Sequence, residues 1–313
     1  MFAPGFIKST TPQPQKLDAQ PTQLLSRIEM AKNYYKYEPS MAAAVIFIIT
    51  FSTSSLLHAF QIIKTKTWFF IPFLVGSLFE TVGFIGRAIG AGESPDYTFA
   101  PYVMQHLLLL LGPTCYAASI YMILGRLIRL LDAERYSLIR SSWLTKFFLI
   151  GDLLSIALQG IGGGKVVNAE TEDDRSTGEN IIIAGLVVQI IFFSLFMIVT
   201  CLFHFRIRKN PTARAESIST RWELFLLILY ITSILILIRS LFRLVEYAMG
   251  HDSELQSKEV YIYVLDGAPM LIASTLFNIF HPSRYLVFGK QLVDGSNSEM
   301  QLADYDTAYR PVA

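Results

Sequence analysis

Seven apolar stretches, each about twenty residues long, fill most of the middle of this chain. A helix rises about 1.5 Å per residue, so a stretch of this length crosses a hydrocarbon core of about 30 Å. Lipid offers no partner for backbone polar groups, and a helix satisfies them internally. The fold is therefore predicted to be an all-α membrane protein, a bundle of seven transmembrane helices. The predicted spans are Met41–Gln61, Trp68–Gly90, Pro101–Ile123, Leu144–Gly163, Ile181–Phe203, Glu223–Met249 and Val260–Phe280.

The overall composition agrees with a membrane protein and excludes several other classes. Hydrophobic residues make up 52% of the chain and charged residues only 16%. The net charge of +1 gives no general attraction to nucleic acid, so no nucleic-acid partner is expected. Cys115 and Cys201 both lie in apolar spans, which excludes a disulfide framework. The first forty residues are polar, so the first span is expected to act as an uncleaved signal-anchor.

Basic residues are distributed unequally between alternate connections. Lys and Arg gather in 62–67, 124–143, 204–222 and the C-terminal tail, but are few or absent in 91–100, 164–180 and 250–258. Cytoplasmic connections carry the excess of Lys and Arg. This pattern predicts an external N-terminus and a cytoplasmic C-terminus, although the N-terminal tail is itself basic.

The chain divides into three predicted regions. Residues 1–39 form an extracellular polar tail, residues 40–287 the seven-helix domain, and residues 288–313 a disordered cytoplasmic tail without periodicity. The external segment 164–180 is acidic and too polar for a core, so it is expected to be a solvated cap or a flexible loop.

Charged side chains occur inside the apolar spans, where each costs on the order of 3 kcal/mol at mid-bilayer depth. Glu80 and Arg87 lie on one helical stripe, and Arg239, Arg243 and Glu246 lie on another. Lipid cannot satisfy these groups, so mutual pairing across the second, fourth, sixth and seventh spans is predicted, in the outer half of the bundle. The candidate binding residues are Glu80, Arg87, Gln105, His106, Asp152, Gln159, Gln189, Arg239, Arg243, Glu246 and Asp266.

Two interpretations of this polar centre stay open. One is a buried ion-pair network that fixes how the helices register against one another. The other is a polar cavity, open to the outside or to the outer leaflet, that receives a charged headgroup.

Smaller features predict local packing. Gly86 and Gly90 form a small-xxx-small pair that would admit another helix closely. Gly112-Pro113 and Gly267-Ala268-Pro269 predict kinks in the third and seventh spans. Ser52–Ser55, together with His58, is expected to make local or interhelical hydrogen bonds.

Motifs of soluble catalysis are absent from the sequence. It contains no P-loop, no GxSxG, no HExxH and no His/Cys cluster at metal-ligand spacing. The chain is therefore expected to be neither an enzyme nor the carrier of a cofactor or metal. Any transport would be passive or driven by a gradient.

At these residues the sequence resembles the fungal RTA-like family of lipid-translocating exporters, over about residues 37–287. Phe84 stands where a tyrosine is expected in the family, which removes a hydroxyl. The segments that carry the resemblance are Tyr37–Ser40, Glu80–Arg87, Gln105–Leu107 through Pro113, Ala118–Tyr121, Gly125-Arg126, Gly151–Ser155 with Gln159, Gly162–Gly164, Gly185–Gln189, Arg239–Arg243 with Glu246, Asp266 and His281-Pro282.

The resemblance implies a multi-pass membrane protein, often of the plasma membrane, linked to translocation of sphingoid long-chain bases and to resistance to toxic amphiphiles. Its expected partners are membrane lipids or amphipathic small molecules. The first functional hypothesis is an exporter of such lipids; the alternatives are a seven-helix receptor-like sensor and a regulator of another transporter. The basic 204–222 loop is expected to contact anionic lipid. The sequence leaves the oligomeric state open.

Overall fold

The computed structural model of this chain describes residues 37–94, 97–169, 171–217, 221–249, 255 and 258–286. Seven helical segments in this part are long and apolar enough to cross a membrane, which confirms the predicted seven-helix architecture. Most of the predicted N-terminal tail and all of the predicted C-terminal tail lie outside the described residues. The spanning helices are α2 (Met41–Thr65), α3 (Ile71–Gly92), α4 (Phe99–Leu130), α5 (Ser141–Val167), α6 (Glu172–Lys209) and α8 (Arg221–Ala248), and the seventh span combines α10 (Glu259–Tyr261), the π-helix Ile262–Gly267 and α11 (Ala268–Ile279).

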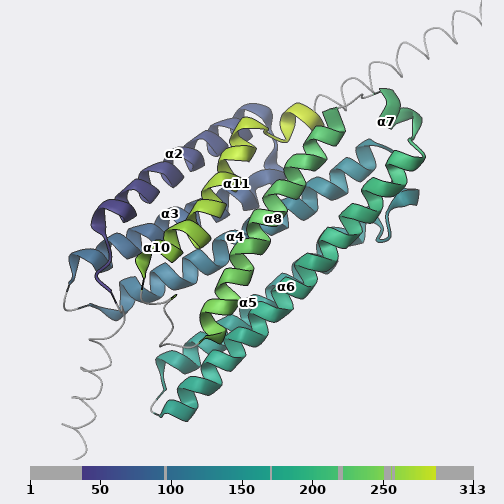
Figure 1. The fold of residues 1–313 in the computed structure, drawn as a ribbon. Helices are drawn as coiled ribbons and strands as arrows, with labels where there is room; N and C mark the ends of the chain where they lie inside the picture. Colours follow the sequence, from purple (N-terminus) through teal and green to yellow (C-terminus); the bar gives the residue numbers. More distant parts are fainter. Residues whose placement is uncertain are drawn as a thin grey trace, which may run out of the picture.

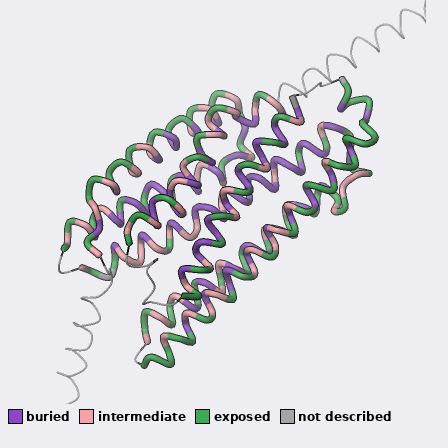
Figure 2. The backbone as a smooth tube through the Cα atoms, viewed as in Figure 1, coloured by how far each residue is buried: buried purple, intermediate pink, exposed green. Residues whose placement is uncertain are grey.

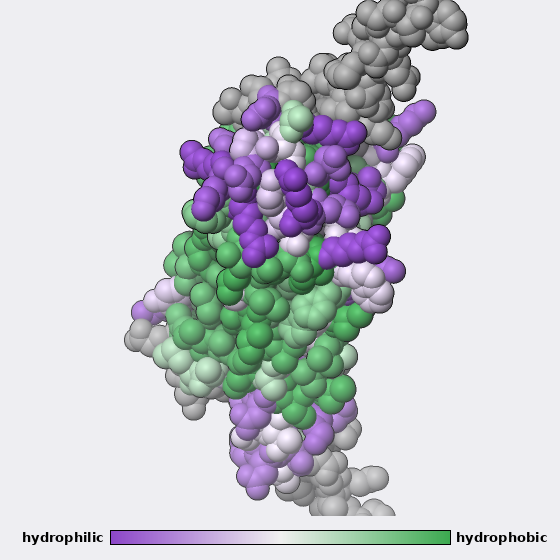
Figure 3. Space-filling view, turned by 90° about the vertical axis from the view of Figure 1, so that its right-hand side faces the viewer, coloured by the Kyte–Doolittle hydropathy of each residue, from purple (hydrophilic) through white to green (hydrophobic). Residues whose placement is uncertain are grey.

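Successive spans run in opposite directions, so the bundle has two ends (Figure 1). The Tyr37 end holds the starts of α2, α4 and α6; the Lys209 end holds their last turns and the short helix α7 (Ala213–Ser217). Figure 3 shows a hydrophobic band between hydrophilic residues gathered at both ends. This is the surface that a membrane-spanning bundle presents, with lipid around its middle and water at both ends.

The segment 164–180 corrects one expectation. Residues up to Val167 belong to α5 and residues from Glu172 belong to α6, so most of the segment is helical and not a flexible loop. Thr171 caps α6, because its hydroxyl accepts a hydrogen bond from the Asp174 backbone N–H at 3.1 Å. Acidic residues in the first turn also suit the positive end of the helix dipole.

Close helix packing depends on glycines at two interfaces. A Cβ atom at Gly86 of α3 would lie 3.0 Å from the Pro101 carbonyl of α4, which confirms the predicted close approach at this position. A Cβ atom at Gly162 of α5 would lie 2.6 Å from the Gly178 carbonyl of α6. Buried residues gather where the helices face one another (Figure 2). The α3–α4 and α5–α6 pairs therefore form two tightly packed hairpins.

Hydrogen bonds between side chains join α2 to its neighbours, as expected for this serine-rich stretch. The Ser54 hydroxyl lies 2.6 Å from that of Ser274 in α11, and the Ser55 hydroxyl lies 2.7 Å from that of Ser77 in α3. His58 Nε2 lies 3.2 Å from the Ser274 hydroxyl. All five residues are buried. These contacts satisfy polar groups that lipid could not.

Candidate functional site

Four buried charged residues of α8 and the seventh span form one ion cluster, which we define as Arg239, Arg243, Glu246 and Asp266. Arg239 Nε lies 2.7 Å from Asp266 Oδ1. Arg243 donates to the other Asp266 oxygen and, at 3.1 Å, to Glu246 Oε2. Each of the four residues is at most 6% exposed. The predicted pairing of charges inside the membrane thus occurs between the sixth and seventh spans.

Asp266 reaches α8 from a widened turn of its helix. It lies in the π-helix Ile262–Gly267, immediately before the Gly267-Ala268-Pro269 sequence that predicted a kink. Proline at position 269 supplies no N–H to the preceding turn. π-helical turns are rare and often occur at functional sites. The interruption of the seventh span therefore falls at the residue that anchors the ion cluster.

The proline in α4 explains a further contact of Arg239. In a regular helix the Leu109 carbonyl would accept a hydrogen bond from the N–H of residue 113, but Pro113 has none. Arg239 donates to this carbonyl through Nη2. The buried Glu80 of α3 interacts electrostatically with Arg239. The ion cluster is thereby connected to α3 and α4.

Arg87 does not join this cluster. Its guanidinium is fully buried near the Tyr37 end, where it pairs with Glu259 at 2.8 Å and donates to the hydroxyls of Tyr263 and Tyr37, each at 2.9 Å. Glu259 also accepts from the Ser40 backbone N–H at 2.7 Å. We call Tyr37, Ser40, Arg87, Glu259 and Tyr263 the Arg87 clasp. It joins the segment before α2 to α3 and to the start of the seventh span.

Asp152 corrects the expected participation of the fourth span. It is 1% exposed in α5, and no cation lies within ion-pair distance of it in the described part of the chain. Its polar neighbour is the Tyr121 hydroxyl of α4. Helical spacing predicts the buried face of Asp152 correctly, but it does not predict which helix that face meets.

This isolation predicts a small effect of Asp152→Asn. The substitution keeps the shape of the side chain and removes no ion pair, so the melting temperature and abundance of the protein should change little. Thermal unfolding of the purified protein in detergent measures this. A loss of stability as large as that of a substitution in the ion cluster would show that Asp152 has an ionic partner.

Gln159 of α5 and Gln189 of α6 link these two helices. The Gln159 amide nitrogen lies 2.5 Å from the Ser155 hydroxyl and 3.2 Å from Gln189 Oε1. Ser155 in turn donates to the Gly185 carbonyl at 2.8 Å. Gln159 Oε1 is buried and has no hydrogen-bond partner among the described residues. Gln159 therefore retains one unused acceptor.

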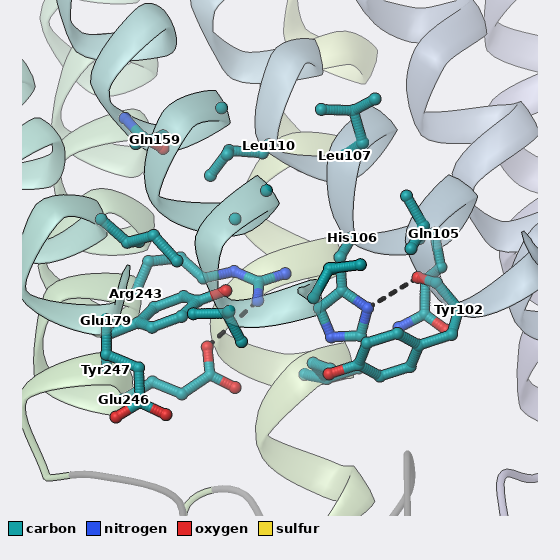
Figure 4. A pocket seen from close by; sticks show the side chains of 18 of the residues that line it. Tyr102, Gln105, His106, Leu107, Leu110, Gln159, Glu179, Arg243, Glu246 and Tyr247 are labelled. Atoms are coloured by element: carbon teal, nitrogen blue, oxygen red, sulfur yellow. Dashed lines mark hydrogen bonds and ion pairs between the residues drawn. The ribbon is translucent and has the colours of Figure 1, made fainter. Parts of the chain in front are cut away.

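A cavity of about 430 Å³ lies between α4, α5, α6 and α8 in the half of the bundle nearest the Tyr37 end (Figure 4). Small-molecule sites are commonly of about this size. His106 and Arg243 contribute polar groups, while Leu107, Leu110 and Ile182 contribute apolar surface. The wall also includes the exposed Lys258, so the cavity reaches the surface at this end. Its mixed lining suits an amphiphile.

The structure divides the eleven predicted site residues into groups, where the sequence predicted one shared pocket. The cavity is lined by Gln105, His106, Gln159, Arg243 and Glu246. Asp266 pairs with the lining residue Arg243 and with Arg239, and Glu80 interacts electrostatically with both arginines, but Glu80, Arg239 and Asp266 do not line the cavity themselves. Arg87 belongs to the clasp, and Asp152 and Gln189 lie elsewhere on the α5–α6 hairpin. The spacing of residues along one helix predicts which side chains share a face, but not where a neighbouring helix diverges and leaves a cavity.

Several cavity residues were missed by sequence reasoning. Arg175 and Glu179 form an i,i+4 ion pair at 3.2 Å in the first turns of α6. Tyr247 interacts electrostatically with both Glu179 and Glu246. The cap residue Thr171, followed three residues later by an acid, was the available signal that helix α6 begins early enough to bring Glu179 to this wall.

The family described as RTA1 like protein matches residues 73–290. Protein RTM1 of Saccharomyces cerevisiae is 35% identical over 283 residues, covering 78% of this chain and 89% of the relative. Protoporphyrin uptake protein 1 of the same species, strain ATCC 204508 / S288c, is 35% identical over 280 residues, covering 78% and 90%.

A third relative carries a name that specifies a lipid. The Sphingoid long-chain base transporter RSB1 of Saccharomyces cerevisiae strain YJM789 is 26% identical over 298 residues, covering 83% of this chain and 77% of the relative. No solved structure matches the chain. The extent of the family match and the 35% identities establish that this seven-helix membrane protein belongs to the RTA1-like family.

Proposed function

We propose that the protein transports lipid-like amphiphiles of the sphingoid long-chain base type, and that the cavity binds their headgroups. The observation that carries the proposal is the cavity itself, which combines apolar walls with buried charges inside a membrane bundle. The names of two relatives support it, because one is a transporter of sphingoid bases and the other takes up protoporphyrin. Sphingoid bases and protoporphyrin are both amphiphilic compounds.

The cavity offers carboxylates to a cationic head. Glu179 of α6 and Glu246 of α8 both line it, and Figure 4 shows them beside Tyr247 on one side of the space. A sphingoid base carries an amine and hydroxyl groups, which can donate charge-assisted hydrogen bonds to carboxylates. Glu246 forms a buried ion pair with Arg243, whereas Glu179 forms an ion pair with Arg175, whose side chain is partly exposed. Glu179 is therefore the carboxylate more available to a ligand.

The orientation and location belong to the same proposal. Exposed basic residues at the Lys209 end, including Arg206, Arg208 and Lys209, support a cytoplasmic location for that end and contact with anionic lipid there. The cavity then faces the outer leaflet, the C-terminus is cytoplasmic, and the plasma membrane is the proposed site of action. Export of sphingoid bases and resistance to toxic amphiphiles are part of the same proposal.

Reconstitution tests the proposal most directly. Purified protein in proteoliposomes should accelerate movement of a labelled long-chain base. Glu179→Gln should raise the half-maximal concentration about tenfold or more, because a hydrogen bond to a charged group contributes about 1.5 to 3 kcal/mol and each 1.4 kcal/mol corresponds to a factor of ten. Glu172→Gln is the matched control, since Glu172 is an exposed acid of the same helix outside the cavity lining. Wild-type protein that moves no base would refute transport, and equal effects of the two substitutions would remove the headgroup role of Glu179.

A further inference from the structure

Helices α4 and α5 meet closely in one half of the bundle only. Near the Lys209 end, a Cβ atom at Gly125 would lie 3.3 Å from the Ser141 carbonyl, and the rings of Tyr121 and Phe148 are 5.4 Å apart. Toward the Tyr37 end the cavity lies between the two helices, and Figure 1 shows the α5–α6 hairpin diverging from α4 there. The two helices thus leave an opening in the wall of the bundle.

This opening faces the membrane. Leu107 of α4 is 45% exposed and Val167 of α5 is 46% exposed, yet both line the cavity. Gly160 and Gly164 are also exposed and also line it. Leu107 and Gly160 lie inside helices that are long and apolar enough to cross a membrane, and the exposed side of such a helix faces lipid within the bilayer, whereas Val167 ends α5. The cavity is therefore continuous with the lipid-facing surface between α4 and α5.

Glycines on α5 keep the opening wide. A Cβ atom at Gly160, Gly163 or Gly164 would meet no heavy atom within 4 Å, whereas one at Gly162 would meet the backbone of α6. Glycine inside a helix costs about 0.5 to 1 kcal/mol relative to alanine. Helix packing accounts for Gly162 but not for the other three. These three glycines instead leave α5 without side chains where it borders the cavity.

An unused polar atom lies beside this space. Gln159 is 4% exposed, lines the cavity and has an Oε1 atom without a hydrogen-bond partner among the described residues. In Figure 4 it lies at the end of the cavity away from Glu246. Buried acceptors are normally paired. A donor on a ligand, such as a hydroxyl, would complete this group.

We propose that α4 and α5 form a lateral portal through which a single-chain amphiphile enters from the bilayer, with its polar head in the cavity and its hydrocarbon tail still among the lipids. The portal comprises Leu107, Leu110, Gly160, Gly163 and Gly164. The inference rests on the proposed role of the cavity as the binding site. It specifies a bilayer-resident ligand that never leaves the membrane completely, with a hydroxyl or amine donor placed between Gln159 and Glu246.

Fluorescence quenching tests whether the portal is open. In a protein with Cys115→Ala and Cys201→Ala, a bimane label is attached at Leu110→Cys and the protein is placed in vesicles of lipids with brominated tails. The label should be quenched nearly as strongly as one at Leu153→Cys, a 56% exposed position on α5 outside the cavity lining. A label at Glu172→Cys should be quenched by aqueous iodide instead. Quenching at position 110 by iodide alone would overturn the portal, because the cavity would then open only to water.

Filling the portal provides the second measurement. Gly160→Leu and Gly164→Leu should each lower both the bromolipid quenching at position 110 and the transport rate at least threefold, without loss of thermal stability. Ile161→Leu is the matched control. Ile161 follows Gly160 in α5, is 58% exposed and does not line the cavity. Unchanged quenching and transport in both glycine variants would refute the portal. If the protein transports the base but lipid does not quench the label at position 110, the portal is refuted and the proposed function stands. If lipid quenches the label but no base is transported, the proposed function is refuted.

Discussion

Asp266→Asn should lower the free energy of unfolding by about 3 to 5 kcal/mol, the typical cost of breaking a buried ion pair from one side. Asp266 interacts with both Arg239 and Arg243, so neutralising it leaves two buried guanidinium groups with reduced compensation. Lipid and the surrounding helices offer no water to replace the carboxylate. Thermal unfolding of the purified protein in detergent, together with its abundance in membranes, measures the loss. An unchanged melting temperature would contradict the role given to the ion cluster.

A double variant separates the ion pair from the shape of the side chain. Asp266→Leu should be strongly destabilising, and adding Arg239→Leu should recover part of the stability because one uncompensated charge is removed with its former partner. Arg243 retains Glu246 in this variant. Additive losses from the two substitutions would show that Arg239 and Asp266 do not interact.

Gly162→Ala should produce the second large loss of stability. The added Cβ atom would lie 2.6 Å from the Gly178 carbonyl oxygen, and a backbone atom cannot rotate away as a side chain can. The α5–α6 hairpin must then separate, at a cost of about 1 to 3 kcal/mol or more for overpacking. The melting temperature should fall, and the reconstituted transport rate should fall with it because α6 contributes Glu179 to the cavity.

The neighbouring Gly160→Ala provides the control. No heavy atom lies within 4 Å of its added Cβ atom, so the substitution should be neutral or stabilise the helix by about 0.5 to 1 kcal/mol. Similar losses from both substitutions would contradict the role given to the contact with the Gly178 carbonyl, because Gly160 has no such contact.

Apolar length and helical spacing were sufficient to predict the seven spans and the buried faces of their charged residues. Both follow from local rules, because a bilayer fixes the length of a span and 3.6 residues per turn fix which side chains share a face. Arg243 and Glu246, placed on one stripe by this spacing, are indeed bonded to each other. The serine-rich face of α2 likewise makes the predicted contacts with its neighbours.

The partners of each charged face could not be predicted in this way. Glu80 and Arg87 share a stripe but lie seven residues apart, which is about 10 Å along a helix axis. At the level of Glu80, α3 faces Arg239 of α8. At the level of Arg87, it faces Tyr37 and Glu259. The predicted single pocket therefore separates into the ion cluster and the Arg87 clasp. Which helices diverge to leave a cavity depends on tertiary packing.

The contact between Arg239 and the Leu109 carbonyl has a consequence for how this bundle can diverge in evolution. The acceptor is a main-chain atom, which every amino acid at position 109 supplies. A change of residue type at position 109 therefore leaves the acceptor in place, whereas replacing Pro113 would supply an N–H able to compete for the same oxygen. The contact of α8 with the Leu109 carbonyl of α4 thus depends on the residue type four positions later, Pro113.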